Sequence, residues 1–266
     1  MAVLIAIPAR YASTRFPGKP LAKLRGATGK ARSLVQRSWD AAHNVAGVDR
    51  VVVATDDERI REAAVAFGAE VVMTSSDCRN GTERCAEVSA IFGDRYDVVV
   101  NLQGDAPLTP PWFVEALVAD MRADGAIQVA TPVLRCDAAM LNGLREDRRA
   151  GRVGGTTAVF DTRGRALYFS KEVIPYTGRE FEAGRETPVF HHVGVYAYRP
   201  AALAEYRRWA PGRLEVEEGL EQLRFMENGW SVVCVEVEAR GQAFWEVNNP
   251  VDVPKIEAMF AEWGIE

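Results

Sequence analysis

Three cations lie close together in a loop near the start of the chain. Arg10, Arg15 and Lys19 fall between Pro8 and Pro20, together with hydroxyl groups and a glycine. Arginine can fork onto phosphate oxygens, lysine adds a point charge, and backbone N–H groups supply further donors. The loop contains neither a Walker A motif nor GxGxxG, which argues against the usual ATPase and NAD-binding classes. The pattern therefore indicates either a loop that wraps a triphosphate or a solvated basic loop.

Three further loops carry polar groups next to predicted strands or helices. Residues 74–84 place small hydroxyl and amide groups at a predicted helix start, where they could read a base edge while Arg84 reaches a phosphate. Asp105 directly follows a buried strand, which is a common position for a Mg²⁺ ligand. Residues 246–250 could complete a metal site. Each loop also has a structural interpretation. Residues 74–84 could simply cap a helix start, Asp105 could be an ordinary turn aspartate, and residues 246–250 could cap the last helix.

The remaining candidates lie in the second half of the chain. Glu221 and Gln222 fall inside a predicted amphipathic helix. They could belong to its solvated face, or they could form a hydrogen-bonding pair that binds a polyol or an acid. His191 and His192 are adjacent, so we expect at most one to face a pocket. His43 is the only other histidine in the sequence, which argues against a histidine-based zinc site. It also has no GxSxG nucleophile elbow.

The first half alternates strand-like and helix-like segments, which predicts a parallel sheet with helices on both faces. In such sheets ligands bind beyond the carboxyl ends of the strands, where the polar loops lie. We predict strands at residues 3–7, 50–55, 70–73, 98–102 and 128–132, and helices at 31–45, 58–67, 82–92 and 110–123, with Thr82 as an N-cap.

The pattern changes after about residue 150. We predict strands at 156–161, 166–169, 193–198 and 232–237, helices at 214–227 and 251–263, and a mobile loop at 176–188. The first two of these strands should pair around a turn. No linker separates two domains, so we expect one α/β domain, mostly parallel, with a smaller antiparallel lobe. Its two halves are residues 1–150 and 151–266.

Composition narrows the class of protein. The 266 residues are 48% hydrophobic and 26% charged, which suits a globular α/β domain. A net charge of −5 argues against a nucleic-acid binder. The four cysteines have no CxxC pairing, and no apolar run reaches the roughly 20 residues of a membrane span. We expect reduced thiols, no signal peptide, no membrane contact and a cytoplasmic location.

Seven stretches, in order over nearly the whole chain, resemble the CMP-KDO synthetase (3-deoxy-manno-octulosonate cytidylyltransferase) family. They are IPARYASTRFPGKPL, VVVATDDERI, GTERCAEV, VVNLQGDAPLTPP, ALYFSKEVIPY, HHVGVYAYRP and LEVEEGLEQLR. The resemblance implies a Rossmann-like nucleotide-diphospho-sugar transferase fold, CTP as a substrate, Mg²⁺ as a cofactor, and a homodimer. It also implies a CTP-binding first half and an acceptor-binding and dimerisation second half.

The resemblance assigns roles to individual residues. The CTP-binding set comprises Arg10, Ser13, Arg15, Lys19, Ser76, Gly81, Thr82 and Arg84. Asp105 matches the family's magnesium aspartate and, with Arg15 and Lys19, forms the catalytic set. The set that holds the acidic sugar comprises Gln103, Lys171, His192, Tyr196, Glu221 and Gln222.

The departures from the family pattern cluster on the acceptor side. The family has Glu at Ala106, Arg at Lys171 and usually Lys at Thr156 or Thr157, and this chain has extra length around residues 26–30. It also has Asn248 where the family has a second magnesium aspartate, which removes one charge from the metal site. An acceptor whose attacking oxygen is already ionised needs less help from a metal. A phosphonate such as phosphonoformate is therefore the alternative acceptor.

Two other classes compete with a cytidylyltransferase. A non-catalytic CTP-binding protein would retain the cationic loop while tolerating Ala106 and Asn248. It predicts CTP binding without release of pyrophosphate. An NAD-type oxidoreductase is disfavoured because the glycine fingerprint is absent.

Overall fold

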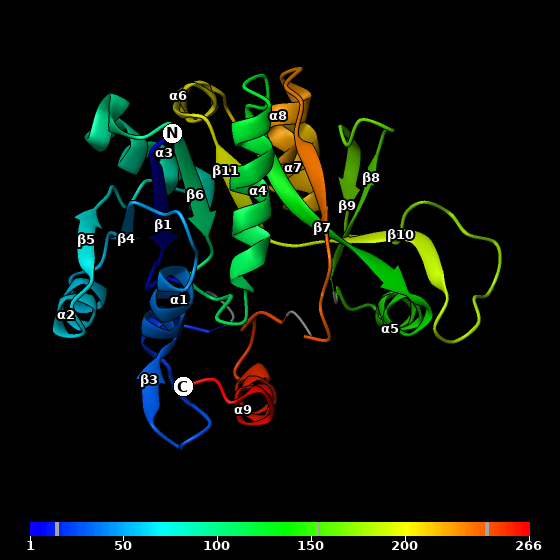
Figure 1. Cartoon of the computed structure of the whole chain (residues 1–266), viewed down its shortest axis with the longest axis horizontal. Coiled ribbons are helices and arrows are strands. Elements are labelled where there is room, and N and C mark those ends of the chain that lie inside the picture. The colour runs from blue at the N-terminus through cyan, green and yellow to red at the C-terminus, as the bar shows by residue number, and fades with distance from the viewer. Residues whose placement is uncertain (14–15, 154, 243–244) are drawn as a thin grey trace.

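The computed structural model describes residues 1–13, 16–153, 155–242 and 245–266. Within these residues, ten strands form one sheet in the order β5-β4-β1-β6-β11-β7-β10-β8-β9, with β12 also paired to β7 (Figure 1). A separate two-stranded hairpin, β2-β3, lies near the C-terminus of the chain. The architecture is α/β, as the sequence predicts.

The parallel part of the sheet closely follows the sequence-based prediction. Its members are β1 (Val3–Pro8), β4 (Arg50–Thr55), β5 (Glu70–Met73) and β6 (Val98–Leu102). β1 pairs in parallel with β4 on one side and with β6 on the other, and β4 pairs in parallel with β5. The carboxyl ends of these strands therefore meet along one edge of the sheet.

The antiparallel lobe continues the same sheet from β6. β11 pairs antiparallel with both β6 and β7, and the pairs β7-β10, β10-β8 and β8-β9 are antiparallel too, whereas β12 runs parallel to β7. The strands are β7 (Val129–Asp137), β8 (Thr156–Phe160), β9 (Ala166–Ser170), β10 (Glu186–His192), β11 (Val195–Tyr198) and β12 (Val233–Val237). The predicted pairing of 156–161 with 166–169 is confirmed.

Side-chain alternation along the buried strands builds a core on each face. On β1, Leu4 and Ala6 pack with helices behind the sheet, whereas Val3, Ile5 and Ile7 pack with helices in front of it (Figure 1). Each fully buried aliphatic side chain stabilises the fold by about 1.5–3 kcal/mol. The covering helices are α1 (Leu34–His43) and α4 (Pro111–Ala123) in front, and α3 (Gly81–Phe92) and α6 (Pro200–Arg208) behind.

The predicted helix 31–45 begins later than expected. Ala31–Ser33 forms β3, which pairs antiparallel with β2 (Lys23–Arg25) around the extra residues 26–30. The Ser33 side chain then accepts a hydrogen bond from the Gln36 N–H, which caps α1. Helix α9 (Asp252–Trp263) packs on this hairpin through a small apolar cluster that includes Leu24 and Phe260.

The predicted helix 214–227 is broken. α7 (Arg213–Glu218) ends at Gly219, whose φ of 60° is left-handed, and α8 (Leu223–Glu227) begins after Gln222. Glycine adopts this conformation without the strain that a Cβ would cause, so it stops the helix. Glu221 and Gln222 therefore lie in a turn and not on a helix face.

The structure also contains elements that the sequence did not predict. They are α5 (Ala138–Arg149), α6, the strand β10, whose first three residues overlap the predicted loop 176–188, and two 3-10 turns at Lys19–Leu21 and Gly93–Arg95. The second helix of the first half is α2 (Glu58–Ala66), as predicted to within a residue. Among the described residues, no helix is long and apolar enough to cross a membrane.

Candidate active site

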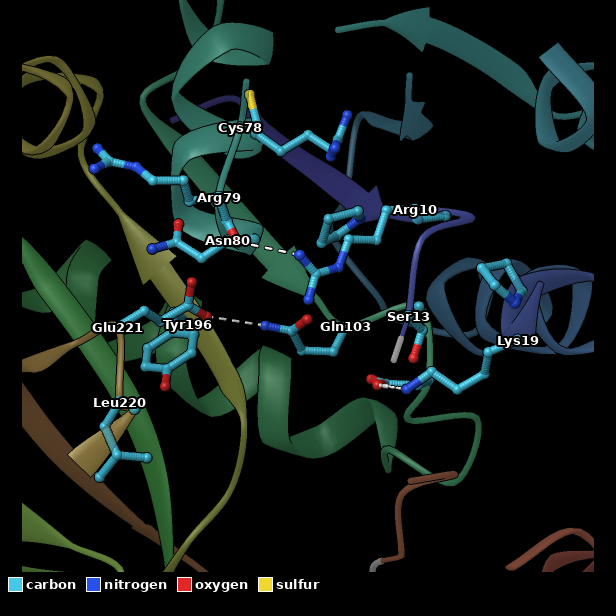
Figure 2. A pocket seen from close by; sticks show the side chains of 18 of the residues that line it. Arg10, Ser13, Lys19, Cys78, Arg79, Asn80, Gln103, Tyr196, Leu220 and Glu221 are labelled. Atoms are coloured by element: carbon cyan, nitrogen blue, oxygen red, sulfur yellow. Dashed lines mark hydrogen bonds and ion pairs between the residues drawn. The ribbon is translucent and has the colours of Figure 1, made fainter. Parts of the chain in front are cut away.

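A cavity of about 460 Å³ opens at the carboxyl ends of β1 and β6. Figure 2 shows Arg10 and Lys19 on one side of it, Glu221 and Tyr196 on the other, and Gln103 between them. The lining comprises Pro8, Ala9, Arg10, Ser13, Lys19, Pro20, Cys78, Arg79, Asn80, Gly81, Arg84, Gln103, Gly104, Asp105, Tyr196, Gly219, Leu220, Glu221 and Gln222. Loops from both halves of the chain therefore build one site.

Lys19 and Asp105 form the most direct link between two of these loops. Gly18, in the left-handed region with a φ of 69°, turns the chain into the 3-10 turn that begins at Lys19. Lys19 Nζ lies 2.5 Å from Asp105 Oδ2 and donates to the Val247 carbonyl at 3.0 Å. The Val247 N–H donates in turn to the Asp105 carbonyl at 2.9 Å. The cationic loop, the end of β6 and the segment before α9 thus converge on one ion pair.

The other cations of this wall differ in how firmly they are held. Arg84 is almost fully buried and forms an ion pair with Asp56 at 3.2 Å, beyond the end of β4. Arg10 is exposed, and its Nη1 donates only a long 3.3 Å hydrogen bond to the Arg79 carbonyl. Ser13 lines the cavity, and Arg15 lies outside the described residues. Arg10 can therefore reorient toward an anion more readily than Arg84 can.

The start of α3 faces the cavity. Asn80 caps this helix, because its side chain accepts from the Glu83 N–H at 2.8 Å, so the prediction that Thr82 is the N-cap is wrong. A Cβ on Gly81 would lie 2.9 Å from Asn101 Nδ2, so only glycine fits at this close approach. The helix N-terminus adds a partial positive charge next to the cations. The arrangement suits a polar, anionic ligand.

The opposite wall is organised around Glu221. Its carboxylate accepts from the Thr82 N–H at 3.0 Å. It also accepts from Gln103 Nε2 at 3.1 Å, as Figure 2 shows. Burial raises the pKa of Glu221, and these two hydrogen bonds oppose that effect. Thr82 itself lies behind the cavity, with its hydroxyl 2.8 Å from the Tyr198 hydroxyl. The wall is thus pre-formed by contacts between α3, β6 and the turn before α8.

Two further polar groups flank Glu221. The Tyr196 hydroxyl donates to Gln222 Oε1 at 3.0 Å. Among the described residues, the buried Gln222 Nε2 has no hydrogen-bond partner. A buried donor without a partner costs free energy, so this N–H group is placed to bind a ligand. His192 packs behind Tyr196, with their ring centroids 5.5 Å apart.

His192 is buried, and its Nε2 lies 2.9 Å from the Thr131 hydroxyl. Burial, with a smaller contribution from His191, lowers the pKa of His192 to about 3. Burial likewise lowers the pKa of His191 to about 4. Both imidazoles are therefore neutral near pH 7, and His192 supports Tyr196 without lining the cavity.

Three other predicted site residues lie outside the lining of the cavity. Ser76 is exposed. The Lys171 ammonium lies beside Gly219, since a Cβ there would be 2.9 Å from Lys171 Nζ, and the Lys171 N–H is held by Glu218 at 2.9 Å. Asn248 follows Val247 directly, and its N–H donates to Asp252 at 2.9 Å.

Sequence reasoning did not assign nine of the lining residues to the site, and three of them, Arg79, Asn80 and Leu220, are instructive. Arg79 and Asn80 belong to the loop that we singled out, but no signal separated them from their neighbours. Asn80 precedes Gly81 and a helix, which is a typical N-cap position, so capping rules could have identified it. Leu220 lines the cavity because the helix breaks at Gly219. The prediction of one continuous helix over 214–227 did not include this break.

The site can hold a metal ion only with help from a ligand. Among the described residues, no group of three or more His, Cys, Asp or Glu side chains could hold one. Asp105 supplies one carboxylate on the cationic side of the cavity, and Glu221 lies on the opposite wall. Mg²⁺ commonly binds through one or two carboxylates together with substrate phosphates. The donor set therefore fits Mg²⁺ bound jointly by Asp105 and a polyphosphate.

An open α/β sheet with a cation-rich cavity at its carboxyl edge is characteristic of nucleotide-binding enzymes. Comparisons with known proteins narrow this class. The sequence model of the cytidylyltransferase family matches residues 4–237. The 3-deoxy-manno-octulosonate cytidylyltransferase of Maricaulis maris is 44% identical over 264 residues, which are 99% of each chain. The mitochondrial enzyme of that name from Arabidopsis thaliana is 40% identical over 260 residues, which are 96% of this chain and 82% of the relative.

A solved structure shares the fold over the full length of the chain. It is a CMP:2-keto-3-deoxy-manno-octonic acid synthetase complexed with CTP, 38% identical, with a TM-score of 0.82 over 99% of this chain and 100% of that one. The chain therefore belongs to the cytidylyltransferase family and, within it, to the CMP-KDO synthetase (3-deoxy-manno-octulosonate cytidylyltransferase) family. The resemblance found in the sequence is confirmed.

Proposed function

We propose that this protein transfers CMP from CTP to 3-deoxy-manno-octulosonate (KDO) or a closely related sugar acid and releases pyrophosphate. The observation that carries the proposal is the Lys19–Asp105 pair at the edge of a 460 Å³ cavity with two chemically different walls. One wall presents cations, and the other presents hydrogen-bonding groups. The names of the relatives and the CTP bound in the related structure support the same assignment.

The cationic wall fits the triphosphate. Arg10 and Lys19 neutralise its charge, with Arg15 as a further candidate from the sequence. The start of α3, with Asn80 and Gly81 in the lining, faces the nucleoside. The acceptor hydroxyl loses its proton to solvent as its oxygen attacks the α-phosphorus. The new P–O bond forms while the bond between the α-phosphorus and the β-phosphate oxygen breaks. Lys19 stabilises the pyrophosphate that leaves when its ammonium exchanges the Asp105 carboxylate for phosphate oxygens.

The wall around Glu221 fits the acceptor. A sugar acid offers several hydroxyl groups and a carboxylate. Gln222 Nε2 is a ready donor for such a group, and Glu221 can accept from a hydroxyl. Tyr196 and His192 fix Gln222 from behind, and Lys171, close to Gly219, adds a positive charge near the carboxylate.

Asp105 would hold Mg²⁺ together with the phosphates of CTP, and Asn248 could add a neutral oxygen. A metal ion bound there would neutralise charge on the triphosphate and lower the pKa of the acceptor hydroxyl. The residues of the chain orient the two substrates for in-line attack and exclude water between them.

Two further features belong to the proposal. A homodimer is the assembly implied by the family. A cytoplasmic location agrees with the cysteines, which are free and buried, and burial raises the pKa of Cys78 to about 11 and of Cys234 to about 12. Thiols of this kind are unreactive and suit a reducing compartment.

The test is pyrophosphate release from CTP and Mg²⁺ with KDO, with phosphonoformate, and without an acceptor. We expect release with KDO. The phosphonate alternative depends on Asn248 and has no support from the relatives, so release with phosphonoformate alone would contradict the proposed acceptor. CTP binding without release for any acceptor would replace the enzyme with a CTP-binding protein.

A further inference from the structure

A buried ion cluster lies behind the cavity, between two of the segments that line it. The Arg224 side chain is fully buried and forks onto Glu215, with Nε–Oε2 and Nη2–Oε1 distances of 2.6 Å each. Its Nη1 donates to Glu83 Oε1 at 2.9 Å. None of these three side chains lines the cavity. The cluster joins α3 to α7 and α8, which lie more than 100 residues further along the chain.

Each carboxylate of the cluster holds a segment that does line the cavity. Glu83 accepts from the Arg79 N–H at 2.7 Å, and Arg79, Asn80 and Gly81 form the lining segment 79–81 at the start of α3. Glu215 lies on α7, which leads directly into the lining segment 219–222. Arg224 follows that segment on α8. The cluster therefore links both segments from behind.

Tyr206 forms a second link between segment 79–81 and segment 219–222. The Arg224 guanidinium stacks over its ring, 4.0 Å from the centroid. The Tyr206 hydroxyl accepts from Asn80 Nδ2 at 2.9 Å and donates to the Glu221 carbonyl at 3.1 Å. One hydroxyl group thus connects segment 79–81 with segment 219–222 directly. The distance between the two segments depends on this side chain, on the cluster below it and on the Thr82 N–H that donates to Glu221.

The charges of the cluster explain why it is rigid. Burial alone would raise the pKa of Glu83, but hydrogen bonds from Arg79 and Arg224 outweigh it and lower that pKa. Burial alone would lower the pKa of Arg224, but Glu215, Tyr206 and Glu83 outweigh it and raise that pKa. Glu83 and Arg224 therefore stay ionised near neutral pH. A buried ion pair is stable only while its hydrogen bonds have good geometry. A side chain that cannot make the bidentate contact leaves a buried carboxylate without its full set of hydrogen bonds.

We propose that Glu83, Arg224, Glu215 and Tyr206 form a positioning clamp that fixes segment 79–81 relative to segment 219–222. The inference rests on the proposed function, in which the first segment contacts the cytidine nucleotide and the second contacts the acceptor. The clamp residues touch neither substrate. They set the separation of the two substrates, so a looser clamp weakens CTP binding and acceptor binding together and slows transfer.

The test compares Arg224→Lys with a matched control, Arg135→Lys. Arg135 makes the same kind of fork, onto Glu236 at 3.0 and 3.2 Å, in an exposed position on β7. Lysine keeps the charge in both variants but cannot make the fork. We expect Arg224→Lys to raise the Kd of CTP about 5–20-fold by calorimetry and the acceptor KM by a similar factor, well below the Tm of the variant. Arg135→Lys should leave both unchanged.

A purely structural role predicts a different result. Arg224→Lys would then lower the Tm and leave the Kd of CTP and the acceptor KM at their wild-type values, which would overturn the proposal. CTP binding is measured without an acceptor and without turnover. Failure of the proposed reaction in the wild-type protein is therefore seen separately from failure of the clamp.

Tyr206→Phe decides the case if Arg224→Lys does not fold. The substitution removes only the hydroxyl that connects Asn80 to Glu221 and keeps the ring under Arg224. We expect a 3–10-fold rise in the acceptor KM with a nearly unchanged Tm. Tyr96→Phe is the control, because its hydroxyl contacts only Arg50 among the hydrogen bonds of the described residues. Equal KM values for the two variants would overturn the clamp.

Discussion

The two walls of the cavity differ in how their side chains are held. On the cationic wall, Arg10 is exposed and makes one long hydrogen bond, and Lys19 pairs with an Asp105 carboxylate that phosphate oxygens can replace. On the opposite wall, Glu221 and Gln222 are fixed by Thr82, Gln103 and Tyr196, with the Arg224 cluster behind them. The first wall can change its ion pairs when a triphosphate binds, whereas the second is pre-formed.

This difference separates the tasks of the two walls. A flexible cation can follow the charge of a triphosphate from the bound state to the departing pyrophosphate. A fixed set of donors and acceptors can hold an acceptor oxygen in line with the α-phosphorus. The substitutions below test whether changes on the cationic wall affect turnover and changes on the pre-formed wall affect acceptor binding.

The largest effect is expected on the cationic wall. Lys19→Ala should lower kcat at saturating CTP about 100–1000-fold, on the order of 3–4 kcal/mol, because it removes the charge that stabilises the leaving pyrophosphate. Steady-state pyrophosphate release measures this effect. Lys30→Ala, in the exposed turn between β2 and β3, is the control. Near-normal turnover of Lys19→Ala would show that the cationic wall only binds substrate.

Acid should destabilise the support of the pre-formed wall. The pKa of His192 is about 3 in the folded protein and about 6.5 in the unfolded chain, so the unfolded chain binds more protons between these values. The free energy of unfolding should therefore fall as the pH drops below 6.5, by about 2 kcal/mol at pH 5 from His192, with a further decrease from His191.

Denaturant unfolding at pH 7 and pH 5 measures this dependence. His192→Asn should lose about half of the decrease, whereas the variant of exposed His43, His43→Asn, should keep all of it. The account of His192 as a buried neutral group is wrong if the two variants show the same pH dependence.

A smaller effect is expected for Glu221→Gln. The amide keeps the shape of the side chain but can no longer accept with both ends, so one hydrogen bond, to Thr82 or Gln103, is lost. We expect the acceptor KM to rise about 10-fold, which corresponds to about 1.4 kcal/mol, with the Kd of CTP within about 2-fold of the wild type. Glu217→Gln, exposed on α7, is the control. A change in CTP binding alone would reverse the assignment of the two walls.

The smallest effect is expected at Asn248. Its neighbour Val247 contacts both Lys19 and Asp105 through its backbone. Asn248→Asp should therefore add a negative charge close to the proposed metal ligand and tighten Mn²⁺ binding in the presence of CTP about 5-fold, on the order of 1 kcal/mol. Electron paramagnetic resonance of free Mn²⁺ measures it directly. Asn249→Asp controls for added charge, and equal affinities for the two variants would remove Asn248 from the metal site.

The sequence predicts the parallel half better than the antiparallel half for a physical reason. Strands such as β6 are buried on both faces and give short, continuous apolar runs. β10 alternates buried and exposed residues and begins in a polar stretch, so it resembles a loop. The loop of Arg10 and Lys19 could be recognised because cations, glycine and proline gather there. The positions of Glu221 and Gln222 could not, because a single left-handed Gly219 decides whether they lie on a helix or in a turn.

The clamp shows a second limit of prediction. Glu83, Glu215 and Arg224 look like ordinary charged positions on helix faces, and nothing in their spacing brings them together. They become one buried cluster only because the fold brings α3 together with α7 and α8. Long-range ion pairs of this kind follow from the tertiary structure.

The central claim is that the two walls bring the α-phosphorus of CTP and an acceptor oxygen together in one cavity. The most direct test follows the label from CTP that carries ³²P in the α-phosphate, incubated with Mg²⁺ and KDO. The account predicts that the label is recovered on KDO as a CMP conjugate, with unlabelled pyrophosphate released in equal amount. Label that remains in CTP, or that appears as free CMP while KDO stays unlabelled, would contradict it.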